Sequence, residues 1–305
     1  MSQRYYPPDQ LAALRRFAIA VTVLTVLGHT ILGFEQSYAQ TLVAIFTAYV
    51  LQLLLETLDA WCQHRRPRFI GGVVPFIDFL LPAHITGAVT AMLLYFNDQL
   101  WIVAFAAAVG IGSKTVFRVP VGQGRRHIFN PSNFGITVTL FAFPGSVGLV
   151  PPWQFTAGLP GILGWGLVGL ICVLGTYING TFTKRLPLIA AWVVGFILQA
   201  IVRNLIFETS FLGSLAPMSG LAFVLFTFYM ISDPATTPAR LWRQVAFGGS
   251  VAAFYGVFMA LHVAMQLFIA LSAVCAVRGI GLCVLALRER HNSRQEITAP
   301  LAAVS

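Results

Sequence analysis

The sequence predicts an all-α, polytopic membrane protein with about ten transmembrane helices, and three observations predict this class. The chain of 305 residues is 57% hydrophobic and only 10% charged, whereas soluble domains carry about 25% charged residues. Apolar runs follow one another almost without a break, most of them near the roughly 20 residues that cross a bilayer core. The basic residues gather in alternate loops, and the roughly ten-residue alternating strands of an outer-membrane barrel are absent from the sequence.

The apolar segments form one integral membrane domain, residues 1–305. The ten expected spans are about 17–33, 39–61, 76–96, 99–117, 129–144, 159–179, 186–207, 217–232, 242–262 and 266–287. Segments 129–144 and 217–232 are short for a full crossing, which predicts tilted or broken helices. If the spans divide into two halves of five, the odd number per half makes the halves inverted repeats.

The Lys and Arg residues indicate how the chain is oriented. An even number of spans places both termini on the same side of the membrane. Every basic residue except Arg203 and Arg278 falls on that side, in the tails 1–16 and 288–305 or in the loops between them. Positively charged loops stay cytoplasmic. We therefore expect a multi-pass protein of the cell membrane with both tails in the cytoplasm.

The net charge of +9 is accordingly a topology signal. Nucleic-acid binding needs a basic face on a soluble element, so we expect no nucleic-acid partner. The expected partner is the lipid bilayer, with anionic lipids near the basic loops. The four cysteines contain no C-x-x-C pair, so we expect neither an iron–sulfur cluster nor another metal site.

The stretch GSKTVFRVPVGQGRRHIFNPSNFG places polar residues directly before the fifth apolar segment. Asn130 precedes Pro131 and is suited to cap a helix that starts there, so one interpretation is a capped helix that re-enters the membrane. The other is an anion site at this helix start, where the cations bind the anion and two asparagines bind a planar polar ring. The candidate binding residues are Lys114, Arg118, Arg125, Arg126, His127, Asn130 and Asn133. His127 has no second histidine near it, so no metal role is expected.

The second polar signature is TFYMISDPATTPARLWRQ. Asp233 precedes Pro234 as Asn130 precedes Pro131, and both pairs fall at the predicted cytoplasmic edge of a short segment. One interpretation is a helix stop with local hydroxyl bonding. The other is a binding site built at a helix break, with Asp233, Thr236 and Thr237 as candidate residues.

Five ionisable residues lie within the apolar runs, and such residues indicate function by default. They are Glu56, Asp59, Asp78, His84 and Arg203. Glu56, Asp59 and Asp78 lie near segment ends, where they are expected to reach water. His84 and Arg203 lie deeper and are the stronger candidates for a function inside the membrane.

These motifs resemble those of two known groups of membrane proteins. HIFNPSNFG and FYMISDPATTP resemble the RnfD membrane component of Rnf electron-transport complexes and the NqrB component of the sodium-pumping NADH:quinone reductase. GSKTVFR, RRHIFNPSNFGITVTL, PPWQFT, RLPLIAAW and FTFYMISDPATTP resemble the UnbU-type membrane protein of enediyne antibiotic gene clusters, from about Val74 to Arg278. The resemblance implies a helical fold of the RnfD/NqrB type and a place in enediyne antibiotic biosynthesis.

The wider family also implies a flavin. Its members carry FMN linked through phosphate to a threonine in an S/T-G-A-T loop. The corresponding loop here, PGSVGLVPPWQFTAGLPG, has the single threonine Thr156 and no G-A-T. We therefore expect no covalent flavin, and the cofactor that the resemblance implies is FMN or riboflavin bound noncovalently.

Three functions remain open on the sequence. The first is an electron-transfer-type subunit with redox or biosynthetic partner proteins on its cytoplasmic face. The second is a transporter or channel for a pathway intermediate, a product or an ion, because the helices are broken and no nucleophile–base constellation marks an enzyme. The third is a membrane scaffold that assembles soluble pathway enzymes.

Overall fold

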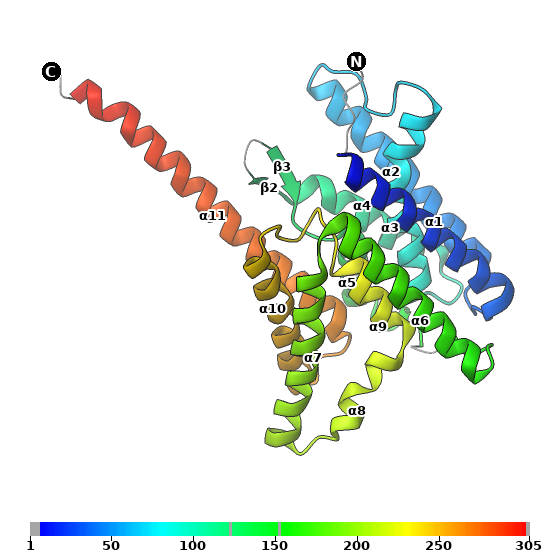
Figure 1. The fold of residues 1–305 in the computed structure, drawn as a ribbon. Helices are drawn as coiled ribbons and strands as arrows, with labels where there is room; N and C mark the ends of the chain where they lie inside the picture. Colours follow the sequence, from blue (N-terminus) through cyan, green and yellow to red (C-terminus); the bar gives the residue numbers. More distant parts are fainter. Residues whose placement is uncertain (1–6, 122–123, 152–153, 303–305) are drawn as a thin grey trace.

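The computed structural model describes residues 7–121, 124–151 and 154–302, which form a bundle of helices (Figure 1). Within these residues, six helices are long and apolar enough to cross a membrane, or seven if a bent pair counts as one span. The six are Pro8–Leu32 (α1 with η1), Tyr38–Cys62 (α2), Val73–Leu93 (α3), Gly161–Thr183 (α6 with η2), Leu186–Phe207 (α7) and Gln266–Glu289 in α11. The bent pair joins Phe211–Ser219 to Leu221–Met230 at 70°. The protein is therefore a helical membrane protein.

The structure contains further α-helices, and several of the spans combine an α-helix with a helical turn. The α-helices comprise α1 (Pro8–Leu27), α4 (Leu100–Val116), α5 (Pro131–Ala142), α6 (Gly161–Ile178), α8 (Phe211–Leu215), α9 (Leu221–Leu225), α10 (Leu241–Ala260) and α11 (Gln266–Ala302). Three π-helical turns, η1 (Gly28–Leu32), η2 (Asn179–Thr183) and η4 (Phe226–Met230), continue α1, α6 and α9. A 3-10 turn, η3 (Ala216–Ser219), follows α8.

Two small antiparallel strand pairs connect the helices. β1 (Leu94–Tyr95) pairs with β4 (Gly148–Leu149). β2 (Arg118–Val121) and β3 (Gly124–His127) form a hairpin between α4 and α5, in which Arg118 is opposite His127. The hairpin carries the middle part of the first polar signature from the end of α4 to the start of α5.

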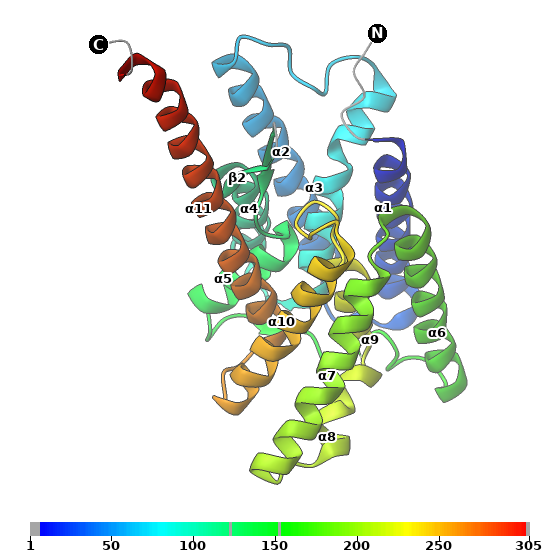
Figure 2. The same ribbon diagram turned by 60° about the vertical axis from the view of Figure 1, so that its left-hand side comes forward.

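The helices pack in two groups (Figure 2). In the first, α1 packs on α3, α2 packs on α3 and α4, and α4 packs on α5. In the second, α6 contacts α9 and η4, α7 packs on α10 and contacts η4, and α10 packs on α11. Contacts between α5 and α11 join the two groups. The polar start of α5 therefore lies at the junction of the two groups.

Glycines allow α4 and α5 to approach closely. A Cβ atom at Gly135 would lie 2.5 Å from the carbonyl oxygen of Ala106, and one at Gly110 would lie 2.7 Å from that of Pro131. A side chain at either position would push the helices apart, because both obstacles are backbone atoms. The first turn of α5 is thus fixed against the end of α4.

Each of the ten expected segments contains helix, although ten crossings remain a prediction. Segment 129–144 holds only the 12 residues of α5, and segment 217–232 falls on the bent pair, so both are short or broken as expected. The described ends of the chain lie at the same end of the molecule (Figure 2). The expected tails, 1–16 and 288–305, are partly helical, because α1 begins at Pro8 and α11 continues to Ala302. The end of α11 projects beyond the rest of the bundle (Figure 1).

Candidate functional site

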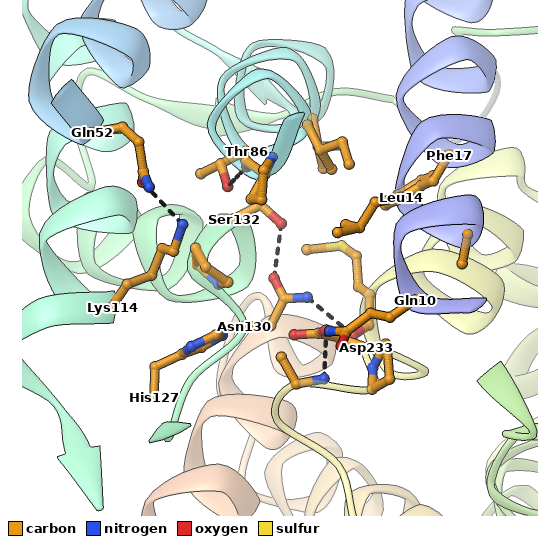
Figure 3. Close-up of a pocket in the computed structure, with 18 of the residues that line it drawn as sticks. Gln10, Leu14, Phe17, Gln52, Thr86, Lys114, His127, Asn130, Ser132 and Asp233 are labelled. Atoms are coloured by element: carbon orange, nitrogen blue, oxygen red, sulfur yellow. Dashed lines mark hydrogen bonds between the residues drawn. The ribbon is translucent and has the colours of Figure 1, made fainter. Parts of the chain in front are cut away.

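A cavity of about 510 Å³ lies where the helix ends of both groups meet (Figure 3). Its walls come from the starts of α1 and α5, the middle of α3, the ends of α2 and α4, the hairpin, η2, and η4 with the turn after it. Pockets for small ligands typically measure about 300–1,000 Å³. Six of the ten candidate residues line this cavity: Lys114, Arg118, Arg125, His127, Asn130 and Asp233. The cavity is therefore the candidate binding site.

The β2–β3 hairpin determines which of its basic side chains face the cavity. Successive side chains of a strand point to opposite faces. Arg125 and His127, two positions apart on β3, line the cavity, as does Arg118 opposite His127 in the register. Arg126, between them, does not line it. The strand turns the Arg126 side chain to the other face, and the binding role expected of Arg126 stays a prediction.

Lys114 at the end of α4 and Arg118 at the start of β2 supply positive charge. The Lys114 Nζ donates a hydrogen bond to Gln52 Oε1 at 3.0 Å (Figure 3). The Arg118 Nε donates to the main-chain oxygen of Lys114 at 2.7 Å. Among the described residues, the ion pairs involve neither side chain. Both charges thus remain available to an anionic ligand group.

His127 lies at the inner end of β3, beside these cations. Burial is the largest cause that lowers the pKa of His127 to about 4, and the charges of Lys114, Arg118 and Arg126 act in the same direction. Asp233 opposes them. The imidazole is neutral at pH 7 and presents one hydrogen-bond donor and one acceptor.

Asn130 caps α5 and links it to the second signature. Its Oδ1 accepts hydrogen bonds from the Asn133 main-chain N–H at 3.1 Å and from the Ser132 hydroxyl at 2.9 Å. Its Nδ2 donates to the main-chain oxygen of Met230 at 3.2 Å. The capping interpretation is therefore confirmed, and the same residue also lines the cavity.

Asn133 joins helices and does not line the cavity. Its Nδ2 donates to the main-chain oxygen of Phe268 at 3.0 Å and to the Ser272 hydroxyl at 2.8 Å, both in α11. The amide points to the side of α5 that α11 occupies, and the binding role expected of Asn133 stays a prediction. The side chain holds the two helix groups together.

Asp233 shapes the turn after η4. Its Oδ1 accepts from the Ala235 N–H at 3.0 Å, and its Oδ2 accepts from the Thr236 hydroxyl at 3.0 Å. The Thr237 hydroxyl donates to the main-chain oxygen of Asp233 at 2.6 Å. The local hydroxyl bonding expected of a helix stop is present. Thr236 and Thr237 are buried within the turn and do not line the cavity, and the binding role expected of them stays a prediction.

Two arginines outside the candidate set hold this turn in place. The Arg185 Nε donates to the Thr237 hydroxyl at 2.9 Å, and the Arg278 Nη1 donates to the main-chain oxygen of Thr236 at 2.7 Å. Sequence reasoning counted Arg185 only as a loop charge. Of the two, only Arg278 had a sequence feature that indicated a structural role, because it is a basic residue inside a predicted apolar segment.

The wall formed by α2 is acidic but neutralised. Glu56 and Asp59 line the cavity, and both bind Arg65 at 2.5 Å. Glu56 also accepts from the Arg68 N–H at 2.8 Å. The expectation that Glu56 reaches water is wrong: it is 6% exposed, because the two arginines of the following loop cover it. The unneutralised positive charge of the cavity therefore lies on Lys114 and on the hairpin.

Aromatic rings form an apolar part of the cavity wall. Phe17 of α1 and Tyr229 of η4 both line it and stack with ring centroids 4.7 Å apart and planes within 10°. Sequence reasoning missed this pair, although Tyr229 lies inside the second signature. The cavity thus combines an aromatic wall with a cationic one.

No family model matches the chain, and no curated protein matches it. The resemblance to the RnfD/NqrB family and to the UnbU-type protein therefore stays a prediction. The fold and the cavity define the class as a helical membrane protein with a cavity of polar and apolar side chains in its bundle.

Proposed function

We propose that the chain crosses the membrane ten times as two inverted five-helix repeats, with the cavity and both termini in the cytoplasm. The two described ends lie at one end of the bundle, as ten crossings require. The basic loops border the cavity at that end. The positive-inside rule then assigns this end to the cytoplasm.

The packing order supports the two repeats. The first and third segments pack together in each half, as α1 with α3 and as α6 with α9 and η4. The second and fourth also do so, as α2 with α4 and as α7 with α10. Furthermore, the first segment of each half ends in a π-helical turn followed by a left-handed residue, Gly33 in one and Lys184 in the other.

We further propose that the cavity binds a flavin noncovalently and that the protein is an electron-transfer-type subunit. The observation that carries this proposal is the pairing of a stacked aromatic wall with a cationic wall in one cavity of about 510 Å³. The ring system fits beside Phe17 and Tyr229. Lys114, Arg118 and Arg125 would hold a phosphate, which selects FMN over riboflavin.

A bound flavin supplies one- and two-electron transfer. The residues of this chain would bind and orient it: the cations would hold the phosphate end, and neutral His127 would offer a donor and an acceptor to polar ring atoms. Thr156 lies against Gly164 in the first turn of α6, where a Cβ atom added at Gly164 would be 3.5 Å from the Thr156 Cβ. The cavity is lined by the other end of that helix, from Ile178 onward. Because the length of α6 separates Thr156 from the cavity, the structure favours noncovalent binding of the flavin.

We assign this activity to enediyne antibiotic biosynthesis on the strength of the motifs, with redox or biosynthetic partner proteins at the cytoplasmic face. The cations at the cavity suit a partner or cofactor with acidic groups. Four of the resembling stretches fall, at least in part, on residues that position the cavity. PPWQFT lies elsewhere, and its residues 152–153 are outside the described residues.

The absorption spectrum of the detergent-purified protein tests the flavin. We expect a band near 450 nm, roughly the position of flavin absorption, that is released into the supernatant on acid precipitation. The matched variants are Arg125→Gln and Arg126→Gln, which remove the same charge from neighbouring residues of β3. Because only Arg125 lines the cavity, R125Q should weaken FMN binding about tenfold, while R126Q should bind as the wild type does.

Equal losses in R125Q and R126Q would show that the net charge of the loop, not the cavity, attracts FMN. A preparation that is colourless and stays colourless after addition of FMN or riboflavin would contradict the flavin proposal. It would favour the second candidate, a transporter or channel for a pathway intermediate, product or ion. The 70° break between Phe211–Ser219 and Leu221–Met230 is the observation behind that candidate. A colourless protein that also transports nothing would leave the membrane scaffold.

A further inference from the structure

The face of the β2–β3 hairpin that points away from the cavity carries Arg126. This side chain alternates with those of Arg125 and His127, which line the cavity. Contacts join β2 to α11, which lies beside the hairpin (Figure 2). Ile128 packs on the same helix, since a Cβ atom at Gly279 would lie 2.7 Å from its side chain. Arg126 therefore lies on the α11 side of the hairpin, and the proposed flavin site does not use it.

Two further arginines gather with Arg126 beside α11. Arg278 precedes Gly279 in that helix. Its charge interacts with those of Arg126 and Arg243, and Arg243 belongs to the first turn of α10. We call Arg126, Arg243 and Arg278 the arginine cluster. Among the described residues, the ion pairs involve none of the three. Like charges repel one another, so an anionic ligand would stabilise the cluster.

Most of the N–H donors in the arginine cluster are available to a ligand. A guanidinium group has five such donors, and Arg278 uses Nη1 for its bond to the main-chain oxygen of Thr236. The Arg243 guanidinium carbon lies 5.1 Å from the ring centroid of Trp242, a cation–π contact that uses no N–H. Guanidinium groups bind phosphate through paired N–H donors. The cluster therefore fits a phosphate group.

The side chains that neighbour the cluster in α10 and α11 are apolar and exposed. Trp242 is 63% exposed, and tryptophan is enriched where a membrane meets water. Further exposed apolar residues adjoin the arginines in both helices: Leu241 and Val245 in α10, and Val277 and Ile280 in α11. A soluble anion would contact only the charges, whereas a phospholipid would also cover the apolar side chains. Basic pockets between membrane helices bind the head groups of anionic lipids.

We propose that the arginine cluster binds the phosphate of an anionic phospholipid, whose acyl chains cover the exposed apolar side chains of α10 and α11. Phosphatidylcholine carries the same phosphate, but the arginines repel its choline cation. The cluster therefore prefers phosphatidylglycerol, whose head group has no positive charge. The bound lipid links the hairpin to α10 and α11. This site does not depend on a bound flavin.

Native mass spectrometry of the detergent-purified protein tests the lipid site. The protein is titrated with phosphatidylglycerol and, separately, with phosphatidylcholine of the same acyl chains. The variants are Arg126→Gln and Arg243→Gln, with Arg125→Gln as the control, because R125Q removes the same charge from the opposite face of the hairpin. We expect R126Q and R243Q to weaken phosphatidylglycerol binding about tenfold. R125Q should bind it as the wild type does, and phosphatidylcholine binding should be the same in all four proteins.

Equal affinity of the wild type for the two lipids would overturn the site and leave the arginine cluster to an acidic protein partner. Equal losses in R125Q and R126Q would also overturn it, because net charge would then account for binding. Glycerol 3-phosphate at the same concentration should not displace phosphatidylglycerol, and displacement would indicate a soluble phosphate ligand instead of a lipid.

The variants are chosen so that misfolding does not imitate loss of the lipid. Arg126 and Arg243 are exposed, so R126Q and R243Q should elute as monodisperse protein. Arg278 is left unchanged because it also holds the turn after η4. FMN binding should fall in R125Q and stay unchanged in R126Q, the reverse of the order expected for the lipid. Failure of this proposal is therefore distinguishable from failure of the flavin proposal.

Discussion

The two X-Pro turns of this protein look alike in sequence and differ in structure. Asn130 before Pro131 caps a helix and is 7% exposed, with all its side-chain bonds directed into the protein. Asp233 before Pro234 begins a turn that no helix continues for several residues, and it is half-buried at the cavity. The two are joined, because Asn130 donates to Met230 just before the second turn.

The difference teaches that the same dipeptide pattern can serve stability or ligand contact. An Asn amide both donates and accepts, so Asn130 can cap α5 and bind a carbonyl of another segment. An Asp carboxylate only accepts when ionised, so Asp233 can order its own turn but cannot bind a second carbonyl. The first turn therefore holds the fold together, and the second presents a charge.

The largest expected effect is on stability, from Asn130→Ala. This change removes the cap of α5 and leaves the buried oxygen of Met230 with only the longer bond from the Asp233 N–H at 3.5 Å, so we expect a loss of about 2 kcal/mol. Chemical denaturation of the detergent-solubilised protein measures it. Ser132→Ala is the control, because it removes only one bond to the same Oδ1 and should cost less. Equal stability of N130A and wild type would show that the cap is not needed.

Asp233→Asn should change ligand preference more than stability. The amide oxygen can still accept from the Ala235 N–H, so we expect a stability loss within about 1 kcal/mol. Removing a negative charge from the cavity should tighten FMN binding several-fold relative to riboflavin. Titration of both flavins by fluorescence measures the ratio. If D233N unfolds as readily as N130A, the contrast between the two turns fails.

His127 adds a pH dependence beside the second turn. Its pKa is about 4 in the folded protein and about 6.5 when unfolded, so the unfolded state takes up the proton first as the pH falls. This contribution to stability is present above pH 6.5, is lost between about 6.5 and 4, and changes no further below that. Thermal unfolding at several pH values should show a smaller decrease on acidification in His127→Gln than in wild type. Parallel decreases in the two proteins would contradict the assignment.

Sequence reasoning predicted the helices and the cap for physical reasons that act locally. The length of an apolar run predicts a helix, and Asn130 before Pro131 predicts where α5 begins. Which of the basic residues face the cavity depends instead on tertiary structure. Arg125 and Arg126 are the same residue type side by side, and only the hairpin register separates them.

The aromatic wall of the cavity could not be predicted from the local sequence for the same reason. Phe17 and Tyr229 belong to opposite halves of the chain, and nothing in either neighbourhood specifies the other. The arginines on the second turn are similar, since Arg185 and Arg278 reach it from different helices. Cap and turn chemistry could be predicted because it is short-range, whereas the cavity required knowledge of which helix ends meet.

The smallest effect is expected from Thr156→Ala, which lies far from both turns. Thr156 packs at the start of α6, and the cavity is lined by the end of that helix, about 20 Å away at 1.5 Å per residue. A flavin bound in the cavity should therefore be retained, and acid should release the same amount from T156A as from wild type. Absorbance of the supernatant after acid precipitation measures this. If T156A loses a chromophore that stays in the wild-type pellet, the flavin is covalent and lies at the opposite end of α6, and neither turn contacts it.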